Sequence, residues 1–316
     1  MLDRIVVVRR ETRLDGLLAR FGTKGQARFH IEHRGGDFEE YLEEHDTYRR
    51  AVDAVHRNLD LELPVHIVDR SLIPTYVFTG SEAIVPVGQD GLVANVARYV
   101  GAQPIVAVNP DPARFDGVLL PYRPETARAA VEAVLEGRHH ARRVTLAEAV
   151  LDDGQRLAAF NDLFVGARSH VSARYRVRVG EDREEHSSSG LLVSTGAGST
   201  GWMSSVFNMV NGLATSLGAD PVEPLNMEWD DTRLFWATRE PFVSRHSGAR
   251  LVCGFIGPGE ALEVESSMPA DGVIFGDGVE RDFLGFDAGS RVTIRAASRS
   301  ACLVVPRRHG RGGDWA

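Results

Sequence analysis

The stretch from Ile84 to Val96, IVPVGQDGLVANV, limits the folds open to this chain more than any other. A short apolar run that ends at glycines is typical of a buried strand, and a segment able to form a helix follows at once. A glycine-rich turn in this setting leaves backbone N–H groups unpaired, which predicts an anion site beside Asp90. The alternative is an ordinary turn in which Asp90 caps the helix and the glycines only permit the bend. On this stretch alone the ordinary turn is the better interpretation.

Strands and helices alternate through the first part of the chain. Such alternation predicts a parallel sheet that binds ligands at the carboxyl ends of its strands, and both Asp90 and Asn109 fall at such ends. Residues 38–59 carry apolar side chains at helical spacing after Asp37, a suitable N-cap, and predict an amphipathic helix. Residues 11–36 have weak periodicity, and we expect a mixed or partly mobile segment there. Strands are expected at residues 5–8, 65–68, 84–87 and 104–109.

The pattern changes from about Val144 to Ala297, where short strands alternate apolar and polar residues between glycine-rich turns. This predicts an antiparallel β domain interrupted by one helix at residues 202–217. We therefore expect an α/β plus β fold. Residues 1–122 would form a Rossmann-like parallel α/β domain and residues 123–297 a β-rich domain, with residues 298–316 returning to the first domain.

Composition narrows the classes of function. The net charge of −8 provides no basic field for nucleic acid or an acidic membrane surface. The 2 cysteines exclude a disulfide scaffold and a cysteine-based zinc site, and the 11 histidines show no ligand spacing. No apolar run approaches the roughly 20 residues that span a bilayer. The strand expected almost at the start leaves no room for a signal peptide, so we expect a cytoplasmic protein.

A second glycine loop lies in Leu191–Trp202, LLVSTGAGSTGW, and contains G-x-G-x-x-G, the dinucleotide-binding fingerprint. A Rossmann unit needs a second strand that ends in an acidic residue about 20 residues later, and none follows here. A hydride-transfer enzyme is therefore a minor hypothesis. The loop still offers N–H and hydroxyl groups to a polar ligand at a helix N-terminus. Trp202 would either stack on a base or pack in the core.

Asn161 and Asp162 form a polar pair inside the apolar run AAFNDLFVG. An unpaired buried polar group costs roughly 1–3 kcal/mol. The pair is therefore satisfied internally, as in an edge-strand bulge, or it faces a ligand such as a ribose hydroxyl or an amide. Gly276-Asp277-Gly278, in contrast, indicates a hairpin turn.

Four segments together resemble the NAD kinase family, and its mitochondrial-type branch in particular. In chain order they are VGQDGLVANVARYV with IVAVNPDP, then FNDLFVG, then SSSGLLVSTGAGSTGW, and finally LFWATREPFVSR with GDG at 276–278. The resemblance extends over roughly residues 40–290, and the order of the motifs carries more weight than any one of them.

The resemblance implies transfer of the terminal phosphoryl group of ATP, or of polyphosphate, to the adenosine 2′-hydroxyl of NAD. It implies a divalent cation, with magnesium expected, and a homodimer or larger homo-oligomer. Asp90 would be the catalytic carboxylate, and no residue is assigned to the metal. The phosphate or ATP site would contain Gly88, Gln89, Gly91 and Asn109. The NAD site would contain Asn161, Asp162, Thr195, Gly198, Ser199, Thr200, Trp202 and Ser205.

Three positions depart from the family pattern. Gln89 replaces a glycine, and would cost roughly 1–2 kcal/mol if its φ had to be positive. Leu92 replaces a threonine, and Asp162 replaces a glutamate. These changes leave two alternatives open: a related kinase for another hydroxyl-bearing metabolite, or a catalytically weakened nucleotide-binding regulator.

Overall fold

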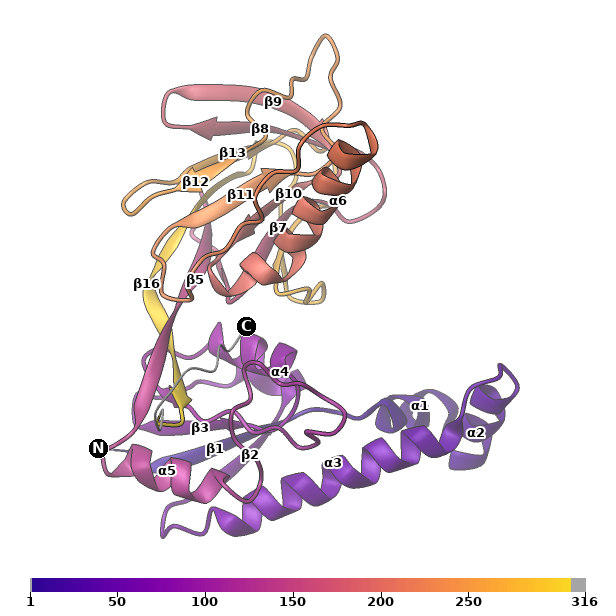
Figure 1. Ribbon diagram of the computed structural model, residues 1–316, viewed down its shortest axis with the longest axis vertical. Coiled ribbons are helices and arrows are strands. Elements are labelled where there is room, and N and C mark those ends of the chain that lie inside the picture. The colour runs from indigo at the N-terminus through magenta and orange to yellow at the C-terminus, as the bar shows by residue number, and fades with distance from the viewer. Residues whose placement is uncertain (1, 308–316) are drawn as a thin grey trace. The chain divides into compact units, whose positions relative to one another are not determined.

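A computed structural model describes residues 2–307 and divides the chain into two compact units (Figure 1). The first contains residues up to Arg142 together with the end of the last strand from Cys302, and the second contains Arg143–Ala301. The expected fold class, a parallel α/β domain and a β-rich domain with one helix, is confirmed. Residues 123–142 lie in the first unit and not in the β-rich domain where we expected them, because Val131 and Val134 pack into the first core.

The first unit has a parallel sheet in the order β2-β1-β3-β4. Ile5 and Val7 of β1 and Val85 of β3 are fully buried, and they pack against Val52 and Val55 on one face of α3. The apolar stripe of α3 recurs at helical spacing, which explains why this helix covers the sheet. The elements are β1 (Arg4–Arg9), α3 (Phe38–Asn58), β2 (Val65–Asp69), a 3-10 helix (Arg70–Thr75), β3 (Glu82–Pro86), α4 (Asp90–Ala97), β4 (Pro104–Ile105) and α5 (Ala127–Leu135).

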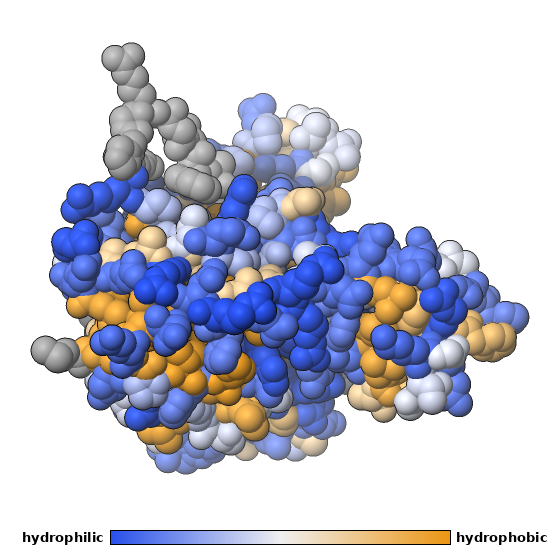
Figure 2. Space-filling view, turned by 90° about the horizontal axis from the view of Figure 1, so that it is seen from below, coloured by the Kyte–Doolittle hydropathy of each residue, from blue (hydrophilic) through white to orange (hydrophobic). Residues whose placement is uncertain are grey.

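Residues 11–36, expected to be mixed or partly mobile, form two helices, α1 (Arg13–Phe21) and α2 (Lys24–Glu32). Thr12 begins α1 with a capping box, in which its hydroxyl accepts the N–H of Asp15 and the Asp15 carboxylate accepts the N–H of Thr12. Leu14, Ala27 and Phe38 form a small core between these helices and the start of α3. In Figure 1 the three elements extend away from the sheet as a helical arm. Figure 2 shows that hydrophobic residues gather in separate patches on a mostly hydrophilic face.

The second unit is a sandwich of antiparallel sheets. One sheet has the order β12-β11-β10-β7-β14-β15, and the other includes β16-β13-β8-β9 with β5 and β6. Tyr175 and Val264 of one sheet share a core with Val165 and Trp236 of the other. The strands are β5 (His140–Leu151), β6 (Arg156–Ala159), β7 (Asp162–Ala167), β8 (Ala173–Val179), β9 (Asp182–Ser188), β10 (Leu191–Ser194), β11 (Leu234–Thr238), β12 (Cys253–Ile256), β13 (Leu262–Ser266), β14 (Gly272–Gly276), β15 (Phe283–Gly285) and β16 (Arg291–Val305).

The single long helix of the second unit, α6 (Trp202–Ser216), lies on the outer face of the six-stranded sheet (Figure 1). Met203 is buried against Phe164, Leu192 and Phe235, but most of the other side chains of α6 are partly or fully exposed. Among the described residues, no helix combines the length and the apolar character needed to cross a membrane.

Candidate active site

The turn between β3 and α4 places Asp90 at the first position of the helix. Gln89 is the N-cap, with a φ of −107° in the extended region, so this position carries no left-handed strain. Gly88 packs closely on Leu92, whose Cδ2 would lie 2.8 Å from a Cβ at this position and would have to shift. The N–H groups of Asp90 and Gly91 have no hydrogen-bond partner among the described residues, as expected for the first turn of a helix. This end of α4 therefore offers two donors to an anion.

The Asp90 carboxylate is held by a neighbouring loop. Its Oδ1 accepts a hydrogen bond of 2.9 Å from the backbone N–H of Leu119. Asp90 is partly exposed and follows a fully buried strand, so its side chain is fixed and still accessible. The arrangement can orient a hydroxyl group and accept its proton.

Asn109, assigned to the phosphate site by resemblance, is 4% exposed and directs its carboxamide into residues 110–121. Its Nδ2 donates to Phe115 O at 2.9 Å, and its Oδ1 accepts from the N–H of Asp111 at 3.0 Å. Gly117 has a φ of +66°, and a Cβ there would lie 2.6 Å from Asn109 Nδ2. Asn109 therefore shapes the loop that holds Asp90, a role that the sequence did not reveal.

Asp162 begins β7 in the second unit and is one of the few buried carboxyl groups there. Its Oδ1 has no hydrogen-bond partner among the described residues. Burial raises the pKa of Asp162 to about 7; Ser194 opposes this shift, and the charge of Asp277 adds to it. The Asn161 carboxamide beside it makes no hydrogen bond to the described residues either. Because β7 lies between β10 and β14, the edge-strand bulge that we considered for this pair is wrong. Two unpaired polar groups side by side indicate a ligand site.

Asp277 holds this segment in position. Its carboxylate accepts the backbone N–H groups of Phe160 at 3.0 Å, Asn161 at 2.6 Å and Asp162 at 3.4 Å. The sequence identified only a hairpin turn here, and β14 and β15 do pair across it. The capping role was missed because its partners lie more than 100 residues earlier in the chain.

The loop after β10 contains hydroxyl groups that are hydrogen-bonded within the protein and glycines that are tightly packed. Thr195 Oγ1 donates to Phe160 O at 2.6 Å, and Ser199 Oγ donates to Gly196 O at 2.7 Å; both side chains are buried. A Cβ on Gly198 would lie 2.1 Å from Asn161 O. These residues shape the loop beside Asn161. Of the other residues assigned to the NAD site, Thr200 and Ser205 are exposed, and Trp202 is partly exposed.

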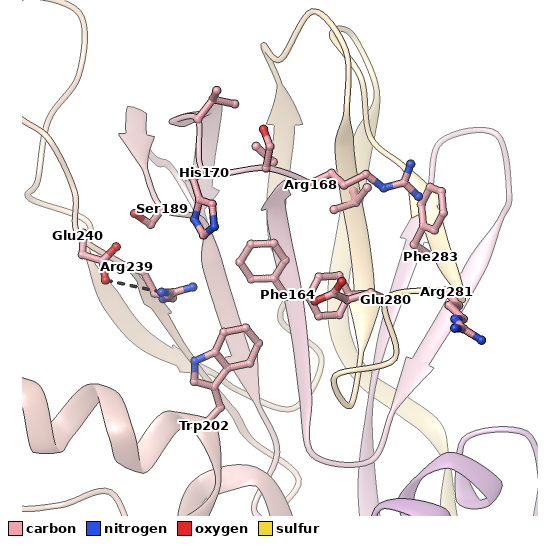
Figure 3. A pocket seen from close by; sticks show the side chains of 15 residues that line it. Phe164, Arg168, His170, Ser189, Trp202, Arg239, Glu240, Glu280, Arg281 and Phe283 are labelled. Atoms are coloured by element: carbon pink, nitrogen blue, oxygen red, sulfur yellow. Dashed lines mark ion pairs between the residues drawn. The ribbon is translucent and has the colours of Figure 1, made fainter. Parts of the chain in front are cut away.

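An aromatic cavity of about 690 Å³ lies beside the loop, within the second unit (Figure 3). Phe164 stacks on Trp202 with ring centroids 5.7 Å apart, and on Phe275 at 4.9 Å. The Arg239 guanidinium lies over the Trp202 ring at 5.3 Å, and Arg168 also lines the cavity. Aromatic walls with guanidinium groups suit a ligand that combines a planar ring with negative charge. Sequence reasoning identified only Trp202 in this group.

No three His, Cys, Asp or Glu side chains in the described part of the chain lie close enough together to hold a metal ion. In phosphoryl-transfer sites, Mg²⁺ is commonly held by one or two carboxylates and by the substrate phosphates. Asp90 is a carboxylate that fits such a shared site.

Comparison with solved structures relates this fold to two kinases. Yeast NADH kinase in complex with NADH aligns over 97% of this chain and 84% of its own, with a TM-score of 0.57 and 13% identity. An NAD kinase from Archaeoglobus fulgidus in complex with ATP aligns over 95% of this chain and 92% of its own, with a TM-score of 0.53 and 19% identity. No family model and no curated protein matches the sequence. The similarity establishes the fold.

Proposed function

We propose that this chain is an NAD kinase-type phosphotransferase, which moves the terminal phosphoryl group of ATP to the adenosine 2′-hydroxyl of NAD. One observation carries the proposal: Asp90 is fixed by Leu119 at a helix N-terminus where two N–H groups have no partner among the described residues. The free N–H groups suit phosphate oxygens, and the carboxylate suits the acceptor hydroxyl. Both structural neighbours are kinases of NAD or NADH, and one is in complex with ATP.

The acceptor would be held by the second unit. The Asp162 Oδ1 and the Asn161 carboxamide, which have no hydrogen-bond partner among the described residues, suit ribose hydroxyls or an amide. Trp202 and Phe164 offer aromatic faces to a base, and the cavity beside them has room for a nucleotide-sized group. These features favour a dinucleotide acceptor over a small polar metabolite.

The reaction would proceed by in-line attack. The 2′-oxygen of NAD forms a bond to the γ-phosphorus as the bond from that phosphorus to the bridging oxygen of ADP breaks. Asp90 accepts the hydroxyl proton late in the step, and ADP leaves with the bridging oxygen. Because charge in such a loose transition state resides on the phosphoryl oxygens, the free N–H groups at the start of α4 would contribute mainly electrostatic stabilisation. Mg²⁺ would supply further neutralisation of the phosphates.

Gln89 argues less against an enzyme than the sequence suggested. Its φ of −107° is accessible to any residue, so the replacement of glycine costs no left-handed strain. Leu92 is buried against Gly88, where it supports the turn. Backbone strain at Gln89 therefore gives no reason to expect a catalytically weakened regulator.

The proposal is tested by incubating the protein with NAD, ATP and Mg²⁺ and measuring NADP. We expect product from the wild type and a loss of roughly 10²–10⁴ in kcat for Asp90→Asn, which removes the proton acceptor. Asp53→Asn, a change at an exposed residue of α3, is the matched control and should keep full activity. A wild type that makes no NADP, or an Asp90→Asn variant with unchanged kcat, would reject the proposal. In the same assay, NADH or nucleosides in place of NAD, and polyphosphate in place of ATP, show whether the protein is a related kinase with another acceptor or donor.

We further propose that the working form is a homodimer or larger homo-oligomer, as the resemblance implies. Residues 202–219 contain no charged side chain. Leu213 and Leu217 on and beside α6 are 58% and 84% exposed. An uncharged apolar surface can associate with a copy of itself without charge repulsion.

A further inference from the structure

The loop that holds Asp90 is itself attached to the helical arm. Leu119 donates to Asp90 from within residues 110–121, and Arg114 of the same loop donates through Nη1 to Glu40 Oε1 of α3 at 3.1 Å. Arg114 and Glu40 are 74 positions apart, so this contact joins two distant segments. Arg114 also lies 3.6 Å from the Asp111 carboxylate, within the loop.

Glu40 belongs to a network of charges on α3. Arg13 of α1 donates to Glu40 at 2.9 Å and also donates to Glu44. Arg10, which follows β1, donates to Glu44 at 3.0 Å. Three guanidinium groups thus surround two carboxylates. The network joins the end of β1, the first helix of the arm, α3 and the loop beside Asp90.

Both carboxylates of the network are held in their charged form. The hydrogen bond from Arg13, with the neighbouring charges of Arg13 and Arg114, lowers the pKa of Glu40. Burial alone would raise the pKa of Glu44, but hydrogen bonds from Arg13 and Arg10 outweigh burial and lower it. The Glu44 side chain is only 5% exposed, so it fixes the two arginines firmly. A network of this kind holds its members better than an isolated surface pair.

We propose that Arg114 is a positioning residue: its ion pair with Glu40 holds residues 110–121 so that the N–H of Leu119 stays on the Asp90 carboxylate. Asn109 anchors the loop from inside, through Phe115 and Asp111, and Arg114 anchors it from outside. The helical arm therefore serves the candidate active site by presenting Glu40 to the loop. The consequence for catalysis rests on the proposed kinase function, whereas the anchoring of the loop does not.

Hydrogen exchange measures the anchoring directly and needs no enzymatic activity. In peptides that cover residues 110–121, Arg114→Met should raise the exchange rate about fivefold, the size expected from loss of a networked surface pair. Arg114→Lys keeps the charge and should recover most of the protection. Glu40→Gln removes the partner and should reproduce the effect of Arg114→Met. Arg128→Met, which breaks the Arg128–Glu132 pair on α5, is the matched control and should leave the loop peptides unchanged. Equal exchange in wild type and Arg114→Met would overturn the proposal.

Steady-state kinetics test the consequence for the reaction. Arg114→Met should lower kcat several-fold with little change in the KM for NAD, and Arg114→Lys should restore it, while the unfolding temperature of each variant stays close to that of the wild type. Faster exchange in Arg114→Met with an unchanged kcat would overturn the positioning role. A wild type that forms no NADP would reject the kinase function, and the exchange experiment would still decide whether Arg114 holds the loop.

Discussion

Asp277 fixes the backbone around Asp162 and at the same time opposes ionisation of its side chain. The Asp277 carboxylate accepts the N–H of Asp162 and those of the two residues before it, and the N–H of Asp277 donates to Asp162 O at 2.9 Å. After burial, which is the main cause, the negative charge of Asp277 also raises the pKa of Asp162. A buried carboxyl group that is held in place and has a strongly raised pKa is typical of a binding site and unusual in a structural core.

Asp162→Asn should stabilise the ligand-free protein at neutral pH. The unfolded carboxyl titrates near 3.8 and the folded one at about 7, so the folded state binds the proton more tightly. The stabilisation that this group contributes is therefore fully present below about pH 4. It is lost as pH rises towards 7, at about 1.4 kcal/mol per unit. Urea unfolding between about pH 4 and 8 should show a gap between variant and wild type that widens with pH. A gap that stays constant, as expected for Asp53→Asn, would contradict the burial of this charge.

Asp277→Ala should destabilise the second unit by roughly 2–4 kcal/mol, because three backbone N–H groups lose their acceptor and alanine at a φ of +55° is strained. Asp277→Asn keeps an acceptor oxygen and tolerates this conformation, so its effect should be smaller. Asp271→Ala isolates the strain alone, since Asp271 has a φ of +60° and no side-chain hydrogen bond among the described residues. Chemical unfolding measures all three, and equal losses for Asp277→Ala and Asp271→Ala would refute the capping role.

Two glycines near α6 should respond in opposite directions to alanine. A Cβ on Gly198 would meet Asn161 O at 2.1 Å, so Gly198→Ala must displace the loop, and we expect a loss of roughly 2 kcal/mol or more. Gly212 lies within α6 with no atom within 4 Å of its Cβ position, so Gly212→Ala should stabilise the helix by about 0.5–1 kcal/mol. Thermal unfolding compares the two, and an unfolding temperature unchanged by Gly198→Ala would show that the loop is not tightly packed against Asn161.

Trp202→Ala should raise the KM for NAD about tenfold or more, because stacking of a base on an aromatic ring is worth roughly 1–3 kcal/mol. Trp202→Phe keeps an aromatic face against Phe164 and should lose less. The KM for ATP serves as the internal control and should not change. Equal effects on both substrates would indicate that Trp202 only packs within the second unit.

Leu213→Glu should dissociate the homo-oligomer, because it places a charge on the apolar surface of α6. Val77→Glu makes the same kind of change at a residue that is 82% exposed in the first unit, and should leave assembly intact. Sedimentation velocity of the three proteins distinguishes these outcomes. A wild type that sediments as a monomer would remove the proposal of self-association.

Local patterns in the sequence predicted most elements closely. The helix expected at 38–59 is α3, and the strand expected at 65–68 is β2, since side-chain periodicity alone distinguishes these elements. The first two helices of the arm were missed because α1 and α2 are nine residues each, too short to be stable alone; they are held by packing around Leu14 and by the cap at Thr12. The place of Asn109 at the end of a strand and the family resemblance are both visible in the sequence, whereas its bonds to Phe115 and Asp111, which shape the loop, are not.

The sequence by itself determined the order of elements, the two glycine-rich turns and the candidate residues Asp90 and Asp162, because turn geometry and periodicity depend on near neighbours. Only the tertiary structure decided which polar groups form hydrogen bonds within the protein and which are available to a ligand. Asp277 reaches residues more than 100 positions away, and Arg114 reaches Glu40 across 74. The role of a side chain depends on the groups that folding brings within about 3 Å of it. In both of these cases the groups are far from the side chain in the sequence.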